Sequence, residues 1–61
     1  MTYDQTRELM ELLDNIETHT SIREREKSKG DDTVWSEVAY YSTLVRESKE
    51  AIFDMLKANT Q

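Results

Sequence analysis

The chain has 61 residues, no cysteine and no proline, and its 13 acidic and 8 basic side chains give a net charge of −5 at pH 7. A chain this short forms one domain and buries only about 60% of its unfolded surface; with disulfides excluded, oligomerisation is the expected source of further stability. The negative charge argues against direct nucleic-acid binding through phosphates. No apolar run approaches the ~20 residues that span a bilayer, so no membrane partner is expected.

Residues 3–29 are predicted to form the first helix. Thr2 and Gln5 have the spacing of a capping box, in which each side chain satisfies a backbone N–H at the helix start. The apolar residues that follow recur at intervals of three and four, which is one face of a helix: Leu9, Leu12, Leu13 and Ile16. Residues 18–21 are weak helix formers. The segment is therefore either one helix or two pieces with a kink near residue 20.

Residues 30–32 are predicted to form the turn. Gly30 is the only glycine, and glycine suits the left-handed conformation just past a helix end. Asp32 or Thr33 is the expected N-cap of the next helix, because its side-chain oxygen can accept a hydrogen bond from an unpaired backbone N–H. We therefore expect an all-α antiparallel hairpin.

Residues 33–58 are predicted to form the second helix. Its apolar residues alternate steps of four and three, which is a heptad seam interrupted only by Ser48: Val34, Val38, Tyr41, Val45, Ser48, Ile52 and Met55. A second, broken stripe on the outer side contains Trp35, Ala39 and Phe53. This helix therefore has more apolar surface than one partner helix would cover.

The first segment covers this seam only in part, because its apolar stripe ends near Ile16 and a charged run, residues 23–27, follows. Folding the chain at Gly30 pairs residues whose numbers sum to about 61, so that Arg23 meets Val38. A lone hairpin is then expected to leave Val34, Trp35, Val38 and Tyr41 poorly covered. We expect two hairpins to form a dimeric four-helix bundle. The residues predicted for self-association or for a protein partner are Val34, Trp35, Val38, Tyr41 and Val45.

The charged run also raises a ligand hypothesis. Its basic side chains lie near aromatic residues, and such a set can hold a small anion such as a nucleotide, with rings stacked on the base and guanidinium groups on the phosphate. The candidate contacts are Arg23, Arg25, Lys27 and Tyr40. The simpler interpretation is that the basic stems cover the rings while their charged ends remain in water.

Catalytic and metal chemistry have little support in the sequence. It has no paired carboxylates, no Ser-His-Asp set and no glycine-rich phosphate loop. His19 is the only histidine, and it is expected to be a packing residue that faces Tyr41 or Ser42. We expect no enzyme activity, no cofactor and no metal.

The predicted function is that of a small interaction protein. Because the apolar stripe of the second helix is only partly covered, we expect the chain to bind and modulate, typically by inhibiting, another macromolecule. Its size, acidity and hairpin layout are common among small regulators encoded by phages and mobile elements. Sequestration of a small anionic ligand by an oligomer is the alternative. A third hypothesis is phosphate or DNA mimicry by the acidic residues of the first helix. Since there is no cysteine and no signal sequence, a cytoplasmic location is expected, in the host if a phage encodes the chain.

Overall fold

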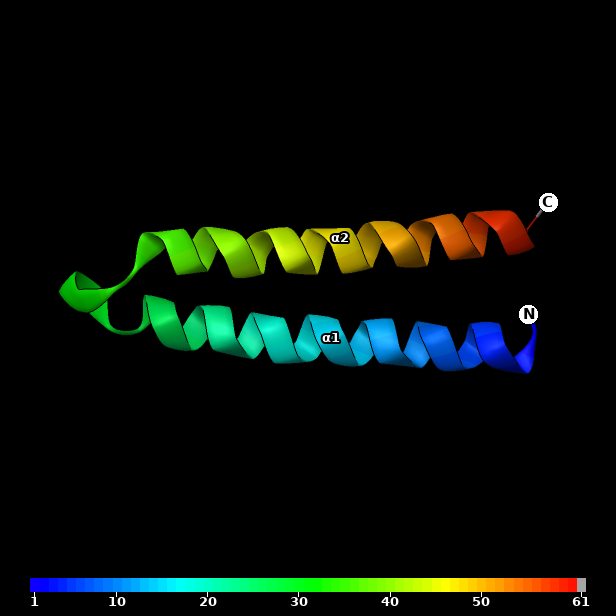
Figure 1. Ribbon diagram of the computed structural model, residues 1–61, viewed down its shortest axis with the longest axis horizontal. Coiled ribbons are helices and arrows are strands. Elements are labelled where there is room, and N and C mark those ends of the chain that lie inside the picture. Colours follow the sequence, from blue (N-terminus) through cyan, green and yellow to red (C-terminus); the bar gives the residue numbers. More distant parts are fainter. Residues whose placement is uncertain (61) are drawn as a thin grey trace.

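The computed structural model describes residues 1–60 and confirms an all-α helical hairpin (Figure 1). Helix α1 (Tyr3–Lys27) and helix α2 (Trp35–Asn59) lie side by side and antiparallel, joined through a short 3-10 helix, η1 (Gly30–Asp32). The hairpin measures 47 × 17 × 11 Å. Both termini lie at one end, which we call the open end, and the turn lies at the other, the turn end (Figure 1).

Helix α1 runs without a break through residues 18–21, which decides between the two predicted alternatives in favour of one helix. The predicted capping box is present at its start. The Gln5 backbone N–H donates to the Thr2 hydroxyl at 3.1 Å, and the Thr2 N–H donates to the Gln5 side chain at 3.0 Å. Packing against α2 explains how the weak helix formers stay helical, since His19 and Thr20 are both half-buried and tertiary contacts supply most helical stability.

The turn contains the predicted left-handed glycine, with Gly30 at φ 67°. The prediction for the second N-cap was wrong. Helix α2 begins at Trp35, and its N-cap is Val34, whose side chain makes no capping hydrogen bond. The Thr33 hydroxyl instead donates backward, to the Glu26 carbonyl at 3.1 Å. Thr33 therefore binds the end of α1 and does not cap α2.

The two helices meet along paired heptad seams. His19 faces Tyr41, with ring centroids 5.8 Å apart, and Glu26 contacts Val34, so facing residues have numbers that sum to about 60. The α1 seam also has alternating steps of four and three. It consists of Gln5, Leu9, Leu12, Ile16, His19, Arg23 and Glu26. Its last three members are polar.

The prediction that a lone hairpin leaves Val38 poorly covered was wrong, because Val38 is only 9% exposed. The α1 seam does not stop at Ile16. The register places Arg23 opposite Val38, and the Arg23 side chain is itself only 25% exposed. Ile22, which lies beyond the expected apolar stripe, is half-buried. An arginine stem can cover an apolar neighbour while its charged end stays in water.

The hydrophobic core of the single hairpin is nevertheless small. Its only buried apolar residues in the described part of the chain are Val38 and Val45. The radius of gyration is 14.3 Å, against about 10.5 Å for a compact chain of this length. The accessible surface is 4753 Å², against about 4,100 Å² for a compact monomer of this mass. The hairpin therefore exposes several hundred Å² more than its size requires.

Candidate interaction surfaces

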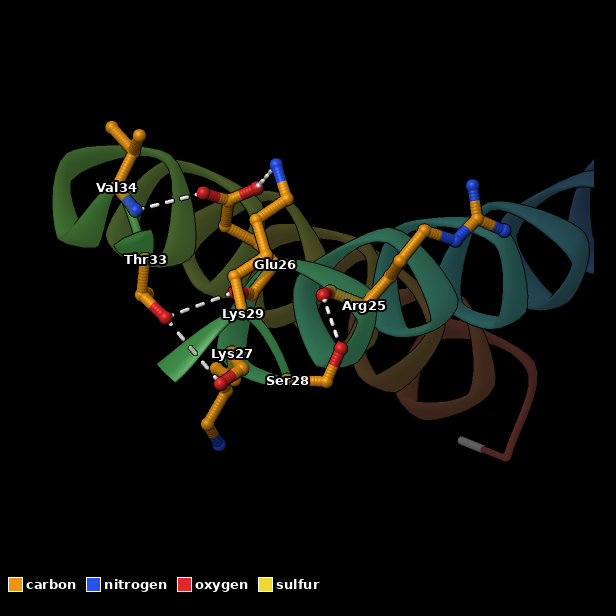
Figure 2. Close-up of polar contacts among 7 residues, drawn as sticks. All are labelled: Arg25, Glu26, Lys27, Ser28, Lys29, Thr33 and Val34. Atoms are coloured by element: carbon orange, nitrogen blue, oxygen red, sulfur yellow. Dashed lines mark hydrogen bonds and ion pairs between the residues drawn. The ribbon is translucent and has the colours of Figure 1, made fainter. Parts of the chain in front are cut away.

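At the turn end, one carboxylate joins the end of α1 to the start of α2. Glu26, near the end of α1, is only 5% exposed. Its Oε1 accepts a hydrogen bond from the Val34 backbone N–H at 2.7 Å, and its Oε2 pairs with Lys29 Nζ at 2.6 Å (Figure 2). The side chain thus satisfies a backbone donor at the start of α2, where a negative charge also interacts favourably with the helix dipole.

The same contacts shift two pKa values. The pKa of Glu26 lies below its ordinary 4.5 because the Lys29 side chain and then the Val34 N–H hydrogen-bond to the carboxylate. The pKa of Lys29 lies above its ordinary 10.5, mainly because of its hydrogen bond to Glu26. Both shifts favour the charged forms, so this buried carboxylate acts as a structural cap at neutral pH.

The hairpin has two broad faces, one on each side of the plane that contains both helix axes. Val45 in α2 and Ile16 in α1 occupy heptad position a. Because equivalent positions of two antiparallel helices lie on the same side, positions e and b of both helices form one broad face, and positions g and c form the other.

The face built from positions e and b exposes large apolar side chains at the open end. We call it the apolar face, after Tyr3, Met10, Leu13, Phe53 and Leu56. These side chains are between 44% and 79% exposed. Towards the turn end the same face becomes polar, apart from Trp35 and Ala39. The charges on this face nearly balance. Two carboxylates, Glu17 and Glu24, oppose three cations, Lys27, Arg46 and Lys49, which gives a net charge of +1.

The opposite face, built from positions g and c, carries most of the negative charge. We call it the acidic face, after Asp4, Glu8, Glu11, Glu47 and Asp54. With Glu37 it has six carboxylates against Arg25 and Lys29, a net charge of −4. It has one large exposed aromatic side chain, Tyr40, which is 58% exposed and packs edge-on against Tyr41.

The structure divides the residues predicted for an interface into two groups. Val38 and Val45 are buried between α1 and α2, and Tyr41 is half-buried beside His19. Val34 and Trp35 are 45% and 65% exposed. The hairpin itself therefore uses Val38 and Val45, whereas Val34 and Trp35 stay accessible at the turn end.

The residues predicted to contact an anion are not gathered into one site. Arg23 lies in the seam, Lys27 on the apolar face, and Arg25 and Tyr40 on the acidic face. Glu24 already pairs with Arg23 at 3.2 Å and with Lys27 at 3.6 Å. Arg25 points away from the cluster around Glu26 (Figure 2). A single copy thus holds two of the three cations in ion pairs with Glu24 and places Arg25 and Tyr40 on another face.

His19 lies in the seam as predicted, opposite Tyr41. Its Nδ1 atom is buried and has no hydrogen-bond partner. Such an unsatisfied polar atom costs stability.

In the part of the chain that the structure describes, no group of three His, Cys, Asp or Glu side chains is placed to hold a metal ion.

A shallow groove runs along the outer side of α2. It is lined by Arg46, Lys49, Glu50, Phe53 and Asp54. Phe53 forms its apolar part, and Arg46 pairs with Glu50 at 3.8 Å beside it. The groove borders the apolar face and widens the surface that a neighbouring helix can contact.

Neither helix of residues 1–60 is long and apolar enough to cross a membrane.

Sequence reasoning missed the apolar face as a unit. It treated Leu13 as part of the α1 seam and Phe53 as part of a separate outer stripe, and it gave no weight to Tyr3 or Met10. A signal was present, because the apolar residues Tyr3, Met10 and Leu13 recur at helical intervals one step to the side of the seam. Only the register between the helices shows that this second row and the Phe53 row share a face.

Comparisons with protein-family models, with curated proteins and with solved structures found no match to this chain. Functional inference therefore depends on the surfaces described above.

Proposed function

We propose that this chain is a small non-enzymatic interaction protein that self-associates into a dimeric four-helix bundle and binds another macromolecule. The observation that carries the proposal is the contrast between the core and the surface. Val38 and Val45 are the buried apolar residues, whereas five large apolar side chains are exposed on one broad face. Contiguous exposed apolar surface of this kind marks an interaction site in a soluble protein.

A dimer explains how so small a hairpin is stabilised. Association of two copies would bury apolar surface from each and enlarge the shared core. If the folded state is a dimer, mass action makes its melting temperature depend on protein concentration. Thermal melts followed by circular dichroism across a hundredfold concentration range should show the midpoint rise with concentration. A midpoint that does not change would contradict self-association.

The acidic face is the surface proposed to meet the second macromolecule. Its net charge of −4 complements a basic surface, and Tyr40 supplies an exposed aromatic contact of the kind enriched at interfaces. The partner is therefore expected to present Lys and Arg residues. Such a contact would block that basic surface, which is how binding would modulate the partner.

This part of the proposal is tested by charge reversal on and off the acidic face. The chain is immobilised, and captured proteins are compared for wild type, for Glu8→Lys with Glu11→Lys, and for Asp14→Lys with Asp31→Lys, two exposed residues that lie on neither broad face. Both double variants change the net charge equally, but only the first alters the acidic face. A partner lost with the first pair and retained with the second supports the proposal. Equal capture by all three proteins would overturn it.

Sequestration of an anionic ligand receives less support, because Arg23 and Lys27 are already paired with Glu24 and the remaining candidates lie on another face. This alternative predicts that a nucleotide or phosphate raises the melting temperature by mass action. It also predicts that Arg23→Ala and Arg25→Ala remove the rise. We expect no rise with either compound.

A further inference from the structure

We infer that a second copy of the chain packs on the apolar face, with the two turns at the same end of the assembly. This inference depends on the proposed dimer and adds the surface and the orientation. The hairpin is 47 Å long and 17 Å wide, so each broad face has these dimensions. The projected area of one face is roughly 800 Å², the size of one partner's share of a standard protein interface.

Charge selects this face over its opposite. Two acidic faces brought together would each bring a net charge of −4, and such like-charge contact is unfavourable. Two apolar faces would each bring a net charge of +1. The overall charge of −5 is therefore carried almost entirely on surfaces that self-association through the apolar face leaves in water.

The uneven distribution of residues along the apolar face selects the orientation. Its open-end half carries Tyr3, Met10, Leu13, Phe53 and Leu56. Apart from Trp35 and Ala39, its turn-end half carries charged and hydroxyl residues: Glu17, Thr20, Glu24, Lys27, Ser42 and Arg46. A symmetric dimer with its turns at the same end brings apolar half against apolar half. With the turns at opposite ends, each apolar half would meet a polar half and leave charged groups unpaired.

The same-end orientation also provides specific contacts. It places α1 of one copy over α2 of the other, so that Met10 and Leu13 approach the groove beside Phe53. Glu17 then lies near the level of the partner's Arg46, a favourable charge pair at the border of the apolar half. Because the contact is isologous, each pair occurs twice.

The face is tested with two matched variants. Phe53 and Tyr40 are 65% and 58% exposed, and they lie on opposite faces. Phe53→Glu is expected to weaken dimerisation at least tenfold, or about 1.4 kcal/mol, as measured by sedimentation equilibrium, whereas Tyr40→Glu changes it little. Circular dichroism confirms that both remain helical. Weakening by Tyr40→Glu but not by Phe53→Glu would overturn the assigned face and leave the dimer itself intact.

The orientation is tested with spin labels, which the absence of native cysteine makes straightforward. One label is attached at Asp31→Cys at the turn end, or at Thr60→Cys at the open end. Turns at the same end predict label-to-label distances within about 25 Å at both sites, since packed helices lie 8–10 Å apart. Distances approaching the 47 Å length of the hairpin at both sites would overturn the orientation. A monomer would overturn the proposed dimer as well.

Discussion

Glu26 and Val34 join the two helices through a single hydrogen bond, 2.7 Å long, from the Val34 backbone N–H to the Glu26 carboxylate. The carboxylate belongs to the last turn of α1, and the N–H belongs to the N-cap of α2. In a capping box the N3 side chain accepts from the N-cap N–H, as Gln5 does for Thr2 at the start of α1. Here a residue eight positions earlier does it, and the same contact fixes how the chain leaves the turn.

Replacing Glu26 should therefore destabilise the hairpin in a graded way. Glu26→Gln keeps an oxygen that can accept from Val34 but loses the ion pair with Lys29. Glu26→Ala loses both contacts and leaves the Val34 N–H without its partner. The expected order of melting temperatures is wild type, then Glu26→Gln, then Glu26→Ala. An Ala variant as stable as wild type would show that this contact does not hold the turn.

The acid dependence of stability should follow from the lowered pKa of Glu26. A carboxyl group whose pKa is lower in the folded state contributes stability above its unfolded pKa, and that contribution is lost as the pH falls through the folded value. The unfolding free energies of wild type and Glu26→Gln should differ at neutral pH and converge as the pH falls below the ordinary 4.5 of the carboxyl group and through its lower folded value. A difference that grows on acidification would contradict the assigned shift.

Gly30 should resist replacement for a conformational reason alone. Its φ of 67° is left-handed, and an added Cβ would meet no atom within 4 Å. Gly30→Ala should cost about 1 kcal/mol, the penalty for an L-residue in this conformation. Gly30→Asn, which tolerates it better, should cost less. Equal losses for Ala and Asn in chemical denaturation would point to another cause.

His19→Leu should stabilise the protein. The change removes the buried Nδ1 that has no hydrogen-bond partner and extends the apolar seam opposite Tyr41. An unsatisfied buried polar group costs about 1–3 kcal/mol, so a gain of about 1 kcal/mol is expected. Denaturant unfolding of the two proteins measures it. A loss of stability would mean that the imidazole makes a favourable contact that leucine cannot replace.

Sequence periodicity was sufficient to predict the helices, the capping box at Thr2 and the left-handed Gly30, because each depends on residues close together in the chain. It was insufficient for the turn-end seam. The run from Arg23 to Lys27 reads as a solvated charged segment, yet Arg23 and Glu26 occupy seam positions. Their burial depends on residues across the turn, Val34 for Glu26 and Val38 for Arg23.

The candidate surfaces show the same limit. Val38 reads as uncovered when Arg23 is treated only as a charge, but an arginine stem is also apolar surface. This has a practical consequence, because Val38→Glu would place a charge between the helices and unfold the hairpin whether or not it dimerises. Phe53→Glu lies on an exposed position and separates the two effects.

Dimerisation through the apolar face is best tested by the solution mass of the wild-type chain, measured by light scattering and compared with that of Phe53→Glu at the same concentrations. We expect a wild-type mass of twice the chain's 7.2 kDa and a helical Phe53→Glu protein that dissociates towards 7.2 kDa. A wild-type chain that stays folded and monomeric throughout the concentration range would contradict it.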